Sequence, residues 1–167
     1  NARRGREGAR ALSWSVDFTN RAKKDLKKLS KRHGDTALSA YREQGFIPDA
    51  MNNYLALLGW SPGHDETIVS MAEMIDRFDG TAISKNPAVF DPTKLEWMNG
   101  SYLREMSDAD FQAHARPLVE DDLGRGLTDD EVLAFASLLP LVKERTKLLN
   151  EIPDQARFLF VAPTEYD

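Results

Sequence analysis

The stretch KKLSKRHGD, residues 27–35, places several cations and a hydroxyl group close together before a turn. Lys28 and Lys31 are three residues apart, with Ser30 and Arg32 beside them. Ammonium and backbone N–H groups in such a loop can bind a phosphate chain, and positive charge beside a departing pyrophosphate lowers the barrier to its release. Short lysine motifs also recur by chance, so the spacing alone favours a solvated basic helix end over a phosphate-binding loop.

Charge is distributed very unevenly around this stretch. Residues 1–32 contain eleven Lys and Arg against Glu7, Asp17 and Asp25, a net charge of +8, whereas the rest of the chain carries −13 and the total is −5. The overall pI of about 5.3 disfavours a polyanionic partner for the chain as a whole. The concentrated basic segment nevertheless favours such a partner locally.

Length and composition restrict the class of protein. At 167 residues the chain is short for a multi-domain enzyme that binds several substrates. It has no cysteine, which excludes disulfides and thiolate metal sites and is typical of a cytoplasmic protein. No apolar run reaches the ~18 residues of a membrane span. His33, His64 and His114 are scattered without a ligand at metal-binding spacing, so no metal site is predicted.

Helix signals dominate the chain after residue 20. The segment SWSVDF, residues 13–18, alternates apolar and polar residues, which indicates a short strand near the N-terminus. Too little strand pattern follows to build a Rossmann sheet, so the predicted fold is mainly α-helical. The expected helices run from Asp35 to Gly45, from Pro48 to Gly59, from a capping box at Ser70 and Glu73, from Asp91 to a stop at Asn99-Gly100, from Ser107, from a second capping box at Thr128 and Glu131 with a kink or restart at Pro140, and from Pro153.

Two other groups of residues have structural interpretations. The aromatic residues that could stack on bases lie beside apolar periodic positions, and we expect core packing for Phe46, Trp60, Phe90 and Trp97. The acidic runs at residues 120–122 and 129–131 lie at expected helix ends, where carboxylates meet the helix dipole, and are not expected to bind a cation.

Longer matches change the interpretation of the basic loop. KLSKR, residues 28–32, resembles the KMSKS signature of class I aminoacyl-tRNA synthetases. The stretches RHGDTALSAYREQGFIPDAMNNYLALLGWSP, NPAVFDPTKLEWMNGSYLRE and EIPDQARFLF resemble the part of bacterial glutamyl-tRNA synthetases that follows the catalytic Rossmann domain. The resemblance covers roughly residues 27–162, and these long matches are far more specific than the five-residue signature.

This resemblance implies a role for each part of the chain. Lys31 would contact the phosphates of ATP and stabilise the transition state of adenylation, with Lys28, Ser30 and Arg32 holding the loop on the nucleotide. Residues 27–106 would comprise this loop and a helical stem-contact region that touches tRNA, and residues 107–167 the first part of a helical anticodon-binding region. Residues 1–26 remain a basic segment of uncertain fold.

The resemblance also has gaps. The family's ATP and glutamate sites need a Rossmann domain with an HIGH-like motif, and the chain contains neither. The expected function is therefore a contribution to glutamate–tRNA ligation, with Mg-ATP bound by the complete enzyme rather than tightly by this chain, and with tRNA and a catalytic domain in the same or another chain as partners. One alternative is a non-catalytic RNA-binding module derived from the synthetase. A minor alternative is that FTNRAKKDLKKL resembles the opening of RelE/ParE-type toxins.

Overall fold

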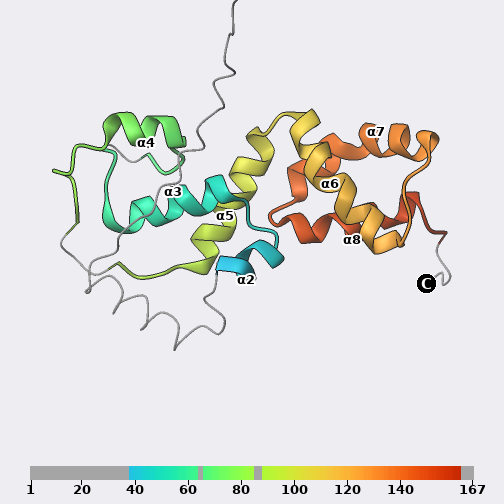
Figure 1. Ribbon diagram of the computed structural model, residues 1–167, viewed down its shortest axis with the longest axis horizontal. Helices are drawn as coiled ribbons and strands as arrows, with labels where there is room; N and C mark the ends of the chain where they lie inside the picture. Colours follow the sequence, from blue (N-terminus) through green and yellow to red (C-terminus); the bar gives the residue numbers. More distant parts are fainter. Residues whose placement is uncertain (1–37, 64–65, 85–87, 163–167) are drawn as a thin grey trace, which may run out of the picture. The chain divides into compact units, whose positions relative to one another are not determined.

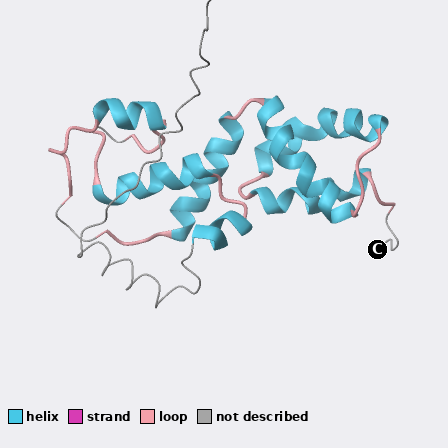
Figure 2. Cartoon of the chain, viewed as in Figure 1, coloured by secondary structure: helices cyan, strands magenta, loops and turns pink. Residues whose placement is uncertain are grey.

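The computed structural model describes residues 38–63, 66–84 and 88–162, which all belong to one compact unit. The prediction of a mainly α-helical fold is confirmed, because the described residues form helices joined by loops and contain no strand (Figures 1 and 2). The elements are α2 (Leu38–Glu43), α3 (Pro48–Gly59), α4 (Met71–Arg77), α5 (Pro92–Glu105), α6 (Asp108–Leu123), α7 (Asp129–Arg145), the 3-10 turn η1 (Leu149–Glu151), α8 (Ile152–Ala156) and the 3-10 turn η2 (Arg157–Leu159). The strand predicted near the N-terminus lies outside the described residues.

The end of α2 and both ends of α3 agree with the sequence prediction, whereas the predicted start of the first helix at Asp35 lies outside the described residues. Gly45 adopts a φ of 91°, a left-handed conformation that favours glycine and ends the α2 segment. Pro48 occupies the first turn of α3, where its missing N–H costs nothing. Met51 and Tyr54 on α3 are buried together with Leu95 and Met98 of α5. This packing sets α3 against α5.

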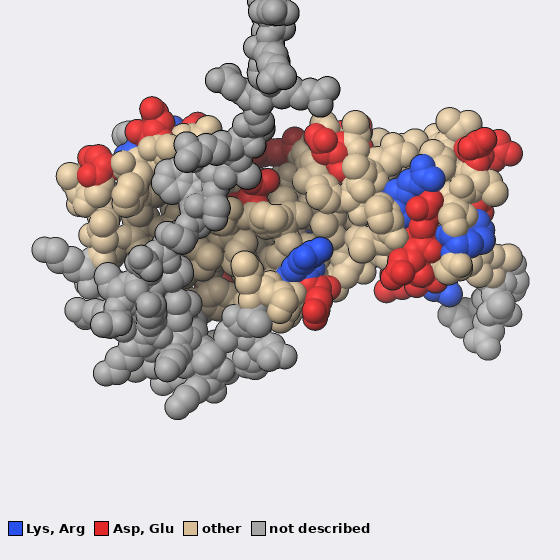
Figure 3. Space-filling model, viewed as in Figure 1, with Lys and Arg blue, Asp and Glu red and all other residues tan. Residues whose placement is uncertain are grey.

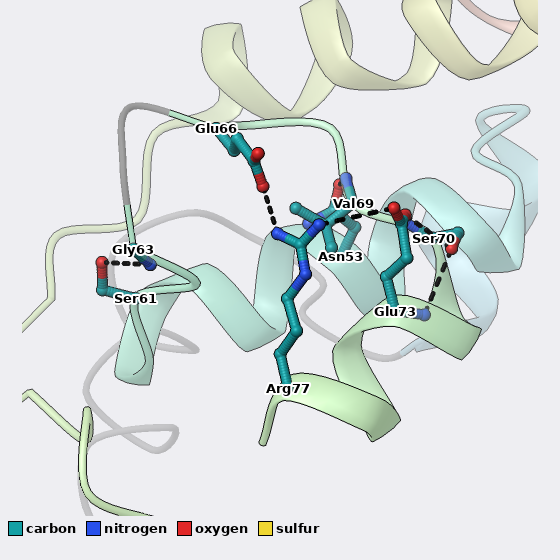
Figure 4. A network of polar contacts seen from close by, with 8 residues as sticks. All are labelled: Asn53, Ser61, Gly63, Glu66, Val69, Ser70, Glu73 and Arg77. Atoms are coloured by element: carbon teal, nitrogen blue, oxygen red, sulfur yellow. Dashed lines mark hydrogen bonds and ion pairs between the residues drawn. The ribbon is translucent and has the colours of Figure 1, made fainter. Parts of the chain in front are cut away.

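Side-chain caps fix the start of α4. The Ser70 hydroxyl accepts from the Glu73 N–H, and the Glu73 carboxylate accepts from the Ser70 N–H, which confirms the predicted capping box. Figure 4 shows the Arg77 guanidinium between the carboxylates of Glu66 and Glu73, with which it forms ion pairs. The segment before α4 is held on α3 because the Asn53 side chain accepts from the Val69 N–H at 3.0 Å.

Helix α5 continues beyond its predicted end. Asp91 caps its start as expected, but the helix does not stop at Asn99-Gly100 and runs on to Glu105. Both residues are buried: Asn99 binds backbone groups from other segments, and Gly100 packs against Lys147. Tertiary contacts thus override the local signal for a helix stop.

Helices α6, α7 and α8 lie beside one another (Figure 1) and enclose a second hydrophobic core. Phe111, Ala115 and Val119 of α6 pack against Phe135 and Leu139 of α7 and against α8. The capping box at Thr128 and Glu131 is confirmed, and α8 has its proline in the first turn as expected. Helix α7 passes through Pro140 without a restart.

The expectation of aromatic core packing is correct for three of the four residues. Trp60 is buried, and Phe46 and Phe90 are half-buried in the cluster around Tyr54. Trp97 is 51% exposed, so its assignment to the core is wrong. On α5, Trp97 is exposed to solvent, whereas Leu95 and Met98 on either side of it in the sequence are buried.

The acidic runs also differ from one another. Asp129, Asp130 and Glu131 lie in the first turn of α7, where the helix dipole favours them as predicted. Glu120 lies near the end of α6, where the dipole disfavours a carboxylate. It is stabilised instead by the Leu127 N–H at 3.0 Å and the Arg116 side chain at 2.8 Å, which lower its pKa.

Candidate functional site

Carboxylates neutralise most of the lysines and arginines that the structure describes. In the C-terminal part, side chains of both signs lie next to one another over α6 and α7 (Figure 3). The ion pairs are Arg77 with Glu66 and Glu73, Arg116 with Glu120, Arg125 with Glu131, Lys143 with Asp108, Lys147 with Glu96, and Arg157 with Asp122. Such surfaces have little attraction for a polyanion.

Helix α5 carries two of the remaining cations. Lys94 and Arg104 make no ion pair with another described residue, and they lie on the same side of the helix as Trp97 and Ser101. These positions follow at intervals of three, four and three residues, which places them along one helical face. We call Lys94, Trp97, Ser101 and Arg104 the α5 stripe.

Local hydrogen bonds order the middle of the α5 stripe. The Ser101 hydroxyl donates to the Trp97 carbonyl at 3.1 Å, and the Arg104 guanidinium donates to the Ser101 hydroxyl at 3.0 Å. The Arg104 side chain therefore lies back along the helix, whereas Lys94 and the Trp97 indole are exposed. An exposed aromatic face between two cations can stack on a base or sugar while the cations contact phosphates.

The opposite face of α5 anchors the stripe. Leu95 and Met98 are buried against α3, and Leu103 is buried in the core of the C-terminal helices. The Tyr102 hydroxyl donates to the Val69 carbonyl at 2.8 Å, and burial, together with nearby carboxylates, raises the pKa of Tyr102 to about 12. The phenol is therefore a neutral hydrogen-bond donor at physiological pH. Packing on both sides holds the α5 stripe on a rigid support.

Family comparisons identify the two halves of the chain. Residues 9–97 match the family described as tRNA synthetases class I (E and Q), catalytic domain, and residues 103–167 match an anticodon binding domain. The chain belongs to the class I tRNA synthetases of the E and Q group. The two matched ranges meet within α5, so the α5 stripe crosses from one family region to the other.

Individual relatives of this synthetase chain agree. It is 40% identical over 143 residues to the glutamate–tRNA ligase of Trichlorobacter lovleyi, with 86% of the chain and 30% of the relative covered. It is 44% identical over 147 residues to glutamate–tRNA ligase 1 of Pseudothermotoga lettingae, with 85% and 31% covered. The crystal structure of the glutamate–tRNA synthetase from Elizabethkingia anophelis matches with a TM-score of 0.68 and 31% identity, covering 84% of this chain and 30% of that one.

These comparisons confirm the resemblance to glutamyl-tRNA synthetases and extend it. The chain spans about 30% of the length of the curated relatives named above. The family match begins at residue 9, upstream of Lys27, so the resemblance extends into the basic N-terminal segment. The same match covers FTNRAKKDLKKL and does not favour the toxin-like alternative.

The predicted ATP-phosphate loop lies outside the described residues of this synthetase chain. Lys28, Ser30, Lys31 and Arg32 all precede Leu38, so their role stays a prediction. Conversely, the α5 stripe was not predicted. Its signal was present in the spacing of its cations and Trp97, but a helix that stops at Gly100 separates Arg104 from Lys94.

A pocket of about 710 Å³ adjoins α2 in this synthetase chain. Its lining includes Arg42 and Phe46 near the end of α2, and His114 of α6. Among the described residues, no group of three His, Asp and Glu side chains is placed to hold a metal ion. None of the described helices is long and apolar enough to cross a membrane.

Proposed function

We propose that this chain is part of a glutamate–tRNA ligase and that its α5 stripe contacts the tRNA. The observation that carries the proposal is the pairing of an exposed Trp97 with two cations, Lys94 and Arg104, that no described carboxylate neutralises. The surface lies where the catalytic-domain and anticodon-domain matches meet. Relatives that share about 40% of its residues are named glutamate–tRNA ligases, which supports a ligase segment over a separate RNA-binding module.

The physical chemistry of the stripe suits a folded RNA. Phosphate contacts from lysine and arginine supply a large share of the affinity of nucleic-acid-binding proteins and carry no sequence information. An indole that stacks on a base adds roughly 1–3 kcal/mol. The remaining described surface is largely neutralised or acidic, so binding would be confined to a narrow strip.

The second part of the proposal concerns ATP. In the complete enzyme, Lys31 would bind the nucleotide phosphates and stabilise the charge that develops on the leaving pyrophosphate, and Lys28, Ser30 and Arg32 would hold the loop in place. ATP supplies the phosphate chemistry that activates glutamate. The described residues would orient the tRNA relative to that reaction.

The experiment that tests the RNA contact is tRNA binding by the 167-residue chain. Lys94→Ala should weaken binding about 3- to 10-fold at ~0.1 M salt, and Trp97→Ala about 5-fold or more. Arg145→Ala is the matched control, because Arg145 is an exposed cation of α7 that makes no ion pair with another described residue. Equal affinities for the Lys94, Trp97 and Arg145 variants would contradict the proposal.

A further inference from the structure

A glycine on α5 brings together two cations that are distant in the sequence. A Cβ atom on Gly100 would lie 3.2 Å from the Arg104 guanidinium and 3.4 Å from the Lys147 Cα. Both residues therefore pack over the bare backbone of Gly100. Lys147 follows α7, so the α5 stripe acquires a neighbour from the anticodon-binding match.

The backbone of Lys147 is held firmly at this place. The buried Asn99 side chain donates to the Lys147 carbonyl at 2.6 Å and accepts from the Ile47 N–H at 2.9 Å. The Lys147 N–H donates to the Glu151 carboxylate at 2.9 Å. The Lys147 side chain itself remains 58% exposed. The fixed backbone sets the point from which the exposed Lys147 side chain extends.

Charge at this place is only partly compensated. Lys147 pairs with Glu96 at 3.1 Å, an exposed pair that contributes little to stability. Arg104 has only the Ser101 hydroxyl as a hydrogen-bond partner among the described residues. Of these two neighbouring cations only Lys147 has a carboxylate partner among the described residues, so the pair attracts a further anion. An exposed lysine can exchange a carboxylate for a phosphate at small cost.

We propose that Arg104 and Lys147 bind one phosphate group of the RNA backbone over Gly100. This inference rests on the proposed function and adds to the α5 stripe a phosphate site that crosses to the segment after α7. Because Gly100 has no side chain, the Arg104 guanidinium and the Lys147 residue lie close together over it, and their cationic groups can reach the same phosphate. Glu96 competes with the phosphate for Lys147 and so limits the affinity of the site.

The test measures tRNA affinity of the full 167-residue chain at several salt concentrations. Arg104→Ala and Lys147→Ala should each weaken binding about 3- to 10-fold, and the double variant should be only slightly weaker than either, because both side chains hold the same phosphate. The slope of log affinity against log salt should fall by about one unit in the double variant. Glu96→Gln should strengthen binding about 2- to 5-fold by removing the competing carboxylate.

Arg145→Ala controls for net charge, since Arg145 lies two residues before Lys147 and outside the proposed site. The shared site is wrong if Lys147→Ala lowers tRNA affinity no more than Arg145→Ala does. It is also wrong if the fold losses of affinity in Arg104→Ala and Lys147→Ala multiply in the double variant, as they would for two separate phosphates. Loss of affinity in the Lys94 and Trp97 variants with none in the Lys147 variant would reject this site while leaving the proposed function intact. Unchanged affinity in all of these variants would reject both.

A second arm identifies the source of the phosphate. Sodium phosphate and sodium chloride are compared at equal ionic strength as competitors of tRNA. The RNA assignment predicts that phosphate competes better than chloride with the wild-type chain but not with the double variant. If inorganic phosphate binds at Lys147 while the double variant retains wild-type tRNA affinity, the site takes free anions only and the RNA assignment fails.

Discussion

The Asn99 side chain donates a 2.6 Å hydrogen bond to the backbone carbonyl of Lys147, 48 residues further along the chain. The same amide accepts from the Ile47 N–H, which lies immediately before α3. One buried side chain therefore ties three segments together: the start of α3, the middle of α5 and the loop after α7. This joint connects the two regions that family comparison distinguishes.

Asn99→Ala should lower the free energy of unfolding by roughly 2–4 kcal/mol, because it leaves the Ile47 N–H and the Lys147 carbonyl without their buried partner. Urea unfolding followed by circular dichroism measures this change. Asn52→Ala, at an exposed position on α3, should change stability by less than ~0.5 kcal/mol. Similar stabilities for the two variants would mean that the joint contributes little.

Gly45→Ala tests the close approach of the Gly45 backbone to the segment that follows Lys147. Gly45 has a φ of 91°, and a Cβ there would lie 2.5 Å from the Leu149 nitrogen and 2.6 Å from the Asn150 nitrogen. Backbone atoms cannot move aside as a flexible side chain can, so the variant should lose roughly 3 kcal/mol or more. Gly63 has a φ of 81° with open space around it, and Gly63→Ala should cost only about 1 kcal/mol. Thermal unfolding of the Gly45→Ala and Gly63→Ala variants separates steric overlap from backbone strain. Equal losses of stability in the two variants would rule out steric overlap at Gly45.

The sequence predicts the parts of this fold that depend on neighbouring residues. Capping boxes at Ser70 and Thr128 and the proline of α3 all act within four residues, and each begins a helix as expected. The end of α5 depends instead on Lys147, which the sequence places far away. An Asn-Gly pair therefore signals a helix stop that the folded chain does not make.

The candidate site likewise depends on tertiary contacts that local sequence signals do not reveal. The phosphate-binding loop could be proposed from a short motif together with long matches to a known family, whereas the α5 stripe requires the full length of α5 and the exposure of Trp97. Local periodicity cannot distinguish a buried tryptophan from an exposed one when Leu95 and Met98 lie on either side of it. The neighbour of Arg104 across Gly100 depends on tertiary packing alone.

Protonation of the Glu131 carboxylate should lower the free energy of unfolding at acid pH. Its carboxylate accepts two hydrogen bonds from Arg125, at 2.7 and 2.8 Å, and others from Thr128, which lower its pKa to about 2 from an ordinary value of 4.5. Because the unfolded chain takes up this proton first, the stabilisation is complete above pH ~4.5 and is lost as the pH falls toward 2.

Glu131→Gln keeps a side chain that can complete the capping box but removes the charge. The difference in unfolding free energy between wild type and this variant should therefore be largest near neutral pH and shrink between pH 4.5 and 2. Asp130→Asn removes the same charge from the same helical turn and serves as the control. A difference that does not vary with pH would show that the Arg125 interaction leaves the Glu131 carboxyl unperturbed.

Lys31→Ala in the complete enzyme tests the assignment of the ATP-phosphate loop. A contact made mainly in the transition state lowers the rate of the chemical step with little effect on the binding of a different substrate. Glutamate-dependent pyrophosphate exchange should slow about 10-fold or more, while tRNA affinity remains nearly unchanged. The Lys94→Ala variant should show the opposite pattern, since the α5 stripe is proposed to bind tRNA. An unchanged exchange rate for Lys31→Ala would remove this lysine from the reaction, and a parallel loss of tRNA affinity would make the loop an RNA contact.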